Sequence, residues 1–182
     1  MNSFIRLFAV LLFALPFPAI AQDGIWLLID TKKMLLDVKL GKVTLVRFDN
    51  ISIGRNGSGF KHQRGDEITP LGRYKISWIN RKSQYNLFYG FNYPSRKNIE
   101  TALKKKLVDI KTFNSVMIAH KNNRVPPQNT PVGGLIGIHG LGRADKKIHA
   151  TMNWTRGCIA LTNEQIEKLD TWVKKETIVI VK

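Results

Sequence analysis

Short apolar and alternating runs, separated by Lys, Gly and Asp, dominate the chain after residue 22. The first three span Ile25–Asp30, Met34–Val38 and Val43–Phe48. Alternation with period two is typical of half-buried β-strands, and the short polar breaks between the runs are typical of tight turns. This segment is therefore expected to form a β-meander.

The same patterns recur farther along the chain. Further strands are expected at Asn50–Gly54, Tyr74–Ile79, Ser115–Ala119, Leu135–Ile138 and Thr177–Val181. The strand at Ser115–Ala119 would end at His120, and the strand at Leu135–Ile138 would end at His139. Both ends are followed by irregular, polar sequence, including the connection 143–154.

Two segments have helical spacing instead. Ser95–Asp109 begins with a good N-cap, and its apolar residues recur at a spacing of three to four. The second helix starts after Thr162, which forms a capping box with Gln165. Because strands outnumber helices, the predicted fold is mostly β with two helices, in a single domain that spans residues 22–182.

The polar segment Arg55–Glu67 contains Gly57 and Gly59. A lone G-x-G that no helix follows is weak evidence for phosphate binding. We therefore expect a mobile loop, and whether it closes over a substrate stays open.

Residues 1–21 have the pattern of a secretory signal. Arg6 precedes an apolar stretch, and Ala19–Ala21 forms an A-x-A cleavage site. The apolar stretch is shorter than the roughly 20 residues that a membrane-spanning helix needs. We therefore expect cleavage before Gln22, export to the periplasm and no membrane span in the mature protein.

The formal net charge of the 182-residue chain is +16. Such a charge attracts anionic partners, of which nucleic acid, a membrane surface and an acidic cell-wall polymer are the candidates. A secreted protein seldom meets nucleic acid, and the chain lacks the interleaved basic and aromatic residues of a nucleic-acid site. Solubility alone is another possible reason for the charge.

Cys158 is the only cysteine in the chain, so it cannot form an intramolecular disulfide. A free thiol is a liability in an oxidising compartment, which favours a catalytic nucleophile. The alternative is a buried cysteine that acts as a small apolar residue. A catalytic Cys158 would be expected to react with iodoacetamide at lower pH than an ordinary thiol does.

A cysteine nucleophile needs a base. His139 is the first candidate because a rigid strand end holds it, and His120 and His149 follow in that order. Gly157 would let backbone N–H groups near Cys158 reach a substrate oxyanion. Arg156 could attract a substrate carboxylate or could be a simple surface charge.

Two motifs in this order resemble those of the L,D-transpeptidase catalytic domain. His139-Gly140 is followed, after a gap of the family's size, by Thr155-Arg156-Gly157-Cys158-Ile159. Upstream, Thr69-Pro70-Leu71-Gly72-Arg73-Tyr74 resembles the family's Thr-Pro-x-Gly-aromatic turn. Ser52–Gly54 and Gly65-Asp66 also stand where family members carry similar residues. Arg156 and Ala160 depart from the residues that are frequent at these positions.

The resemblance implies a β-sandwich-like catalytic fold and a peptidoglycan substrate. Cys158 would attack the carbonyl before the terminal D-alanine of a tetrapeptide stem, and His139, oriented by the Gly140 carbonyl, would carry the proton. Thr155 and Arg156 would contact the substrate. The thioester would be resolved by another stem, a lipoprotein or a free D-amino acid, without a metal or organic cofactor.

Two rival functions remain. Water could replace the acceptor amine on the same scaffold, which would make the protein a hydrolase. A basic wall-binding module with a merely buried Cys158 is the non-enzymatic alternative.

Overall fold

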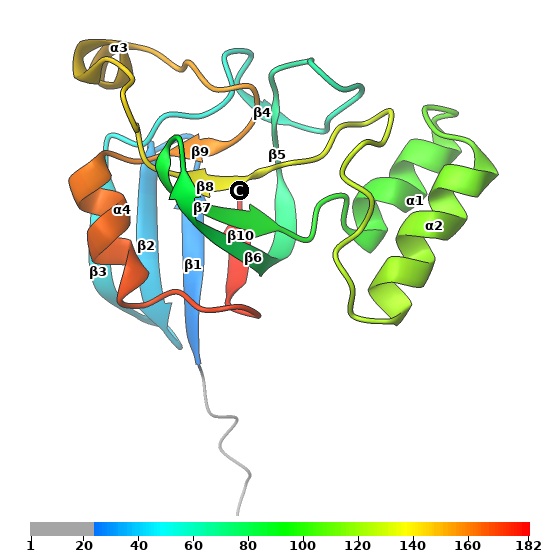
Figure 1. Cartoon of the computed structure of the whole chain (residues 1–182), viewed down its shortest axis with the longest axis horizontal. Helices are drawn as coiled ribbons and strands as arrows, with labels where there is room; N and C mark the ends of the chain where they lie inside the picture. The colour runs from blue at the N-terminus through cyan, green and yellow to red at the C-terminus, as the bar shows by residue number, and fades with distance from the viewer. Residues whose placement is uncertain (1–23) are drawn as a thin grey trace, which may run out of the picture.

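The computed structural model describes residues 24–182, over which ten strands and four helices form (Figure 1). The predicted signal sequence lies outside the described residues. The strands are β1 (Ile25–Asp30), β2 (Leu35–Leu40), β3 (Val43–Asp49), β4 (Ser58–Gly59), β5 (Thr69–Pro70), β6 (Gly72–Ser83), β7 (Asn86–Phe91), β8 (Gly137–His139), β9 (Ile159–Ala160) and β10 (Ile178–Val181). The helices are α1 (Arg96–Lys104), α2 (Ile110–Lys121), α3 (Lys146–Thr151) and α4 (Asn163–Asp170).

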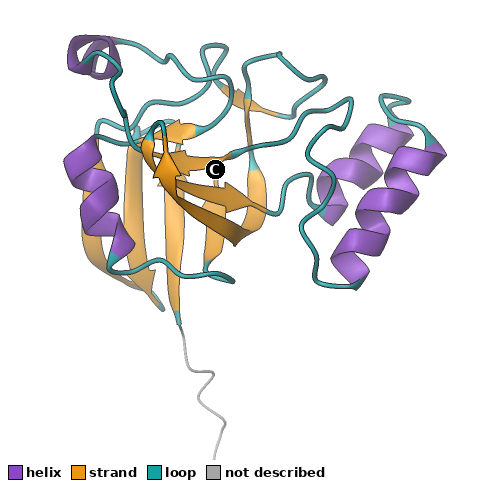
Figure 2. Ribbon diagram, viewed as in Figure 1, coloured by secondary structure: helices purple, strands orange, loops and turns teal. Residues whose placement is uncertain are grey.

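Eight strands form one mixed sheet in the order β3-β2-β1-β10-β6-β7-β8-β9. The long strand β6 pairs with β10 through its first residues and with β7 through the rest. The β6–β7 register shifts between Ile76 and Trp78, just after the part that pairs with β10, and the sheet folds into two layers (Figure 2). The prediction of a mostly β, sandwich-like fold is therefore confirmed.

One apolar cluster joins the two layers. It contains Leu27 of β1 and Val179 of β10 from one layer, and Ile138 of β8 and Ile159 of β9 from the other. All four side chains are fully buried. Helix α4 adds Ile166 and closes this core, and its capping box of Thr162 and Gln165 forms as predicted.

The predicted strand at Ser115–Ala119 is wrong, because these residues lie in α2. Val116 and Ala119, three positions apart, are the buried residues of this helix, whereas Ile118 is exposed. This is a helical period, which a five-residue apolar run does not reveal. Asp109 caps the helix by accepting a hydrogen bond from the Thr112 amide.

The helix predicted at Ser95–Asp109 is shorter than expected. Ser95 caps it as predicted, but α1 ends at Lys104, and Lys106 adopts a positive φ of 58°. The remaining residues turn the chain into α2, so the segment forms a helical hairpin. A short helix, α3, also forms within the predicted polar connection 143–154, which brings the helices in the described part to four instead of two.

No helix within residues 24–182 is long and apolar enough to cross a membrane.

Candidate active site

His139 and Cys158 come together because β8 and β9 are neighbours. The two strands are parallel, with Ile138 paired to Ile159 and His139 paired to Ala160. Paired residues share a face of the sheet, and so do residues two apart along a strand. Cys158, two residues before Ala160, therefore lies on the face of His139. Both residues line a cavity of about 990 Å³.

The Cys158 thiol is half-buried and donates a hydrogen bond of 3.3 Å to the carbonyl of Leu135. Burial raises the pKa of Cys158 to about 11, although a backbone hydrogen bond from Gly137 and the charge of Lys61 lower it. The thiol is therefore protonated at neutral pH.

The imidazole of His139 is fixed in orientation and neutral. Its Nδ1 lies 2.7 Å from the carbonyl oxygen of Gly140, an acceptor that requires the proton on Nδ1. Nε2 is then left to accept a proton. Burial lowers the pKa of His139 to about 4, against the opposing effect of the Gly140 hydrogen bond. The rings of Tyr85 and Trp154 pack on the imidazole at 4.4 and 5.7 Å between centroids.

Gly140 itself fits only without a side chain. A Cβ at this position would lie 2.7 Å from the carbonyl oxygen of Tyr85 and 2.9 Å from Oδ1 of Asn163. The absence of a side chain thus lets the backbone that orients His139 approach its neighbours closely.

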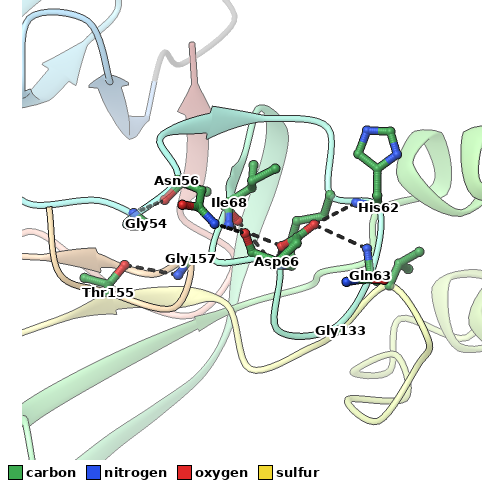
Figure 3. A network of polar contacts seen from close by, with 12 residues as sticks. Gly54, Asn56, His62, Gln63, Asp66, Ile68, Gly133, Thr155 and Gly157 are labelled. Carbon is green, nitrogen blue, oxygen red and sulfur yellow. Dashed lines mark hydrogen bonds and ion pairs between the residues drawn. The ribbon is translucent and has the colours of Figure 1, made fainter.

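The turn before Cys158 is built around the hydroxyl of Thr155. This buried Oγ1 accepts a 3.1 Å hydrogen bond from the Gly157 amide (Figure 3). It also donates a 2.7 Å bond to the Cys158 carbonyl. Gly157 has a φ of +119°, and a Cβ there would lie 2.7 Å from the Ile68 carbonyl oxygen. The Thr155 hydroxyl therefore stabilises the turn through two hydrogen bonds, and it is the acceptor for the Gly157 amide.

The upstream motif packs directly against this turn. Thr69 is fully buried, and its Oγ1 accepts a 2.8 Å hydrogen bond from the Gly54 amide. The same hydroxyl lies 3.5 Å from the Cys158 carbonyl, to which it donates. Gly54 also pairs with Thr155 through an isolated β-bridge. The two sequence motifs therefore form one structural unit.

The segment 55–67, expected to be mobile, is held by Asp66. The carboxylate of Asp66 accepts hydrogen bonds from the amides of His62, Gln63 and Ile68 (Figure 3). It also pairs with the buried ammonium of Lys61, which lines the cavity. Short strand β4 pairs with β5 within the same region. This segment thus forms a wall of the cavity, and the contacts of Asp66 fasten it.

The charges that line the cavity are all positive. The cationic residues are Arg55, Lys61, Arg64, Lys82 and Arg156, and no acidic side chain lines the cavity within residues 24–182. Arg55 and Lys61 form ion pairs, with Glu67 and Asp66. The exposed Arg64, Lys82 and Arg156 have no ion-pair partner in the described part of the chain, so they are available to an anionic ligand.

The other histidines lie elsewhere. His120, on α2, lines a separate cavity and contacts the Pro94 carbonyl at 2.7 Å. His62 is exposed on the loop. His149 is buried in α3 and accepts a 3.3 Å hydrogen bond from the indole of Trp154. Of the four, His139 shares the cavity of Cys158, and His149 reaches it only through Trp154.

A model of the L,D-transpeptidase catalytic domain (YkuD) matches residues 24–181, which is nearly the whole chain. The chain belongs to this family. No curated protein gave a match.

Many solved structures share the fold of this family member, among them proteins from Campylobacter jejuni and Bdellovibrio bacteriovorus. The helical cell shape determining protein Pgp2 from Campylobacter jejuni is 23% identical, with a TM-score of 0.59 over 87% of this chain and 47% of that one. Bd1075 from Bdellovibrio bacteriovorus is 20% identical, with a TM-score of 0.55 over 89% of this chain and 49% of that one. The chain therefore spans about half the length of each.

Several residues that shape the site could not be predicted from the sequence. Gln128 accepts a 2.7 Å hydrogen bond from the Leu135 amide, and Leu135 in turn holds the thiol through its carbonyl. Tyr85 and Trp154 enclose the imidazole. Of the Lys61–Asp66 pair, only Asp66 carried a signal, as part of the family-like Gly65-Asp66. The other residues had none, because their positions depend on the folded loops.

Proposed function

We propose that this protein is a periplasmic L,D-transpeptidase that acts on the tetrapeptide stems of peptidoglycan through a Cys158 thioester. The observation that carries the proposal is the shared cavity of Cys158 and His139, in which the hydrogen bond to Gly140 leaves Nε2 of the imidazole to accept a proton. A nucleophile, a base and a group that orients the base are the elements of a catalytic triad.

In the first half-reaction, the thiol proton passes to Nε2 of His139 as the sulfur attacks the carbonyl that precedes the terminal D-alanine. Because the resting thiol and imidazole are both neutral, this proton transfer accompanies the attack. The Cys158 amide can donate a hydrogen bond to the oxyanion, whereas the Gly157 amide already donates its hydrogen bond to Oγ1 of Thr155. The imidazolium then protonates the leaving amine, which departs as D-alanine and leaves a thioester.

In the second half-reaction, an amine attacks the thioester. His139 accepts a proton from this amine and returns one to the sulfur, so that the product amide forms and the thiol is restored. The acceptor is a second peptide stem, a wall-linked lipoprotein or a free D-amino acid. Water in the same position would give the tripeptide instead.

The charge of the cavity fits such a substrate. A tetrapeptide stem carries carboxylates, and Arg64, Lys82 and Arg156, which form no ion pair within residues 24–182, line the cavity around Cys158. Arg can bind a carboxylate through two parallel hydrogen bonds. We assign Arg156 to substrate binding on this ground, and Thr155 to positioning of the Cys158 turn.

The test is mass spectrometry of a purified disaccharide-tetrapeptide incubated with the protein and with Cys158→Ala. We expect cysteine-dependent dimers that lack one D-alanine. Tripeptide without dimers, and without incorporation of an added free D-amino acid, would show that the protein is a hydrolase and not a transferase. No cysteine-dependent product from a folded protein would refute both.

A further inference from the structure

A second cavity, of about 420 Å³, lies at the other end of strand β6. Its lining comes from the first half of β6, from β10 and from the α1–α2 hairpin, and it shares no residue with the lining of the Cys158 cavity. In Figure 1 this hairpin stands beside the sheet, on the side opposite α4. The cavity is therefore a separate site that the proposed reaction does not use.

Positive charge dominates this cavity as well. Its lining includes the cations Arg73, Lys75, Arg96, Lys97 and Arg124, and one carboxylate, Glu176. Lys75 neutralises Glu176 in an ion pair of 2.6 Å. The other four cations form no ion pair with any residue from 24 to 182. Four cations of this kind around one cavity repel one another, and an anion that binds among them relieves this repulsion.

The backbone and polar groups around the cavity also favour an anion. Arg96 and Lys97 occupy the first turn of α1, which contains no acidic residue. The positive end of the helix therefore faces the same side as these cations. His120 is half-buried in the lining, and its Nε2 already donates to the Pro94 carbonyl, so its ring reports on the cavity and is not counted among the groups that bind the anion. Burial and the charges of Arg96 and Lys75 lower the pKa of this imidazole.

We infer that this cavity is a second binding site for carboxylate groups, which holds peptide stems of the wall polymer away from Cys158. The choice of polymer rests on the proposed function, whereas the preference for anions rests on the four unpaired cations. A polymer with many stems can occupy both cavities at once, and the second contact raises the effective concentration of stems at the first.

The test compares two double variants in a Cys158→Ala background, so that binding is measured without turnover. Arg73→Ala/Arg124→Ala removes two cations of the cavity. Lys147→Ala/Lys168→Ala removes two exposed lysines from α3 and α4 and changes the net charge equally. Sedimentation with purified insoluble peptidoglycan should show affinity about fivefold weaker for the cavity variant and less than twofold weaker for the control. Equal losses of affinity in the two variants, or no loss in either, would overturn the inference that this cavity binds the polymer.

A second measurement localises the contact. Titration with soluble disaccharide-tetrapeptide should shift the NMR signals of His120 in the Cys158→Ala protein, and these shifts should vanish in the cavity variant. Inorganic phosphate is titrated in parallel. If phosphate shifts the signals and the tetrapeptide does not, the site is for phosphate and the inference fails. The binding results stand even if the active protein makes no dimer, so the two proposals fail separately.

Discussion

At the scale of single residues, burial decides the resting state of the site. It raises the pKa of Cys158 to about 11 and lowers that of His139 to about 4, so both groups are neutral at pH 7. This differs from the expectation that the thiol would react at lower pH than an ordinary one. In the proposed mechanism, the nucleophile forms when a substrate enters and the thiol proton moves to His139.

The reactivity of the Cys158 thiol toward iodoacetamide tests whether the thiol is neutral in the resting protein. Iodoacetamide labels only the thiolate, so labelling of the folded protein should be slow at pH 7 to 8 and should rise with pH toward about 11. Intact-mass spectrometry gives the rate at each pH. The denatured protein is the control and should titrate near the ordinary thiol pKa of about 8.5. A plateau already reached at pH 8 in the folded state would show a stabilised thiolate instead.

A second prediction concerns the hydroxyl of Thr155. Thr155→Val keeps the shape of the side chain but leaves the Gly157 amide without its acceptor and the Cys158 carbonyl without this donor. We expect a loss of roughly 1–3 kcal/mol in stability and about tenfold or more in turnover, because the turn that carries the nucleophile loosens. Thr155→Ser, which keeps the hydroxyl, should retain most of both.

Thermal unfolding and turnover of the tetrapeptide measure the two effects. If Thr155→Val were as active as Thr155→Ser, the hydroxyl would have no part in positioning Cys158.

The residues proposed to carry the chemistry were easier to predict from the sequence than the residues that support them. Cys158 and His139 stand in motifs with fixed spacing, so each could be named before the fold was known. Gln128, by contrast, reaches the site through the Leu135 backbone, in a contact between two irregular segments. No periodicity or spacing in the chain encodes such a contact.

At the scale of elements, prediction succeeded where one face of an element is buried throughout. Strand β1 and helix α4 follow their expected periods, and the capping box at Thr162 marks the start of α4. It failed at α2, whose run 115–119 is apolar around most of the helix. The contacts that hold the segment 55–67 could not be predicted either, because the carboxylate of Asp66 bonds backbone amides that any sequence would offer.

The loop held by Asp66 gives a prediction for stability. Burial alone would raise the pKa of Asp66, but hydrogen bonds from Lys61 and from three backbone amides lower it below its ordinary value of 3.8. A depressed folded-state pKa stabilises the fold above the unfolded pKa, and this contribution is lost as pH falls below about 4. Asp66→Asn should destabilise the protein by about 3 kcal/mol at pH 7, because it leaves the Lys61 charge buried without its partner.

Urea unfolding at pH 7 and at pH 3 measures this effect. The difference between the wild type and Asp66→Asn should shrink at the lower pH. Glu67→Gln is the matched control, because it breaks the more exposed pair with Arg55 and should cost less than about 1 kcal/mol. Equal effects of the two substitutions would contradict the special role of Asp66.

At the scale of the whole molecule, two apolar clusters divide the described part of the chain. The main cluster joins both layers of the sheet with α4, and a smaller one contains Ile99, Ala102, Val108, Val116 and Val132. The smaller cluster holds the α1–α2 hairpin, and Arg96 and His120 of this hairpin line the second cavity. We therefore expect the hairpin to open on its own and take the second cavity with it, while the sheet and the Cys158 site stay folded.

Amide hydrogen exchange in two matched variants, one in each apolar cluster, tests whether the hairpin opens independently of the sheet. Val116→Ala removes two methyl groups from the small cluster and should cost about 2 kcal/mol, so amides of α1 and α2 should exchange faster while those of β1 and β10 keep most of their protection. Val179→Ala removes the same atoms from the main core and should speed exchange throughout the sheet. Because Cys158 lies on the sheet, Val116→Ala should weaken binding to insoluble peptidoglycan more than it slows turnover of a soluble stem. Equal exchange in all elements of the Val116 variant would mean that hairpin and sheet unfold as one unit, and the second cavity would then open only when the active site does.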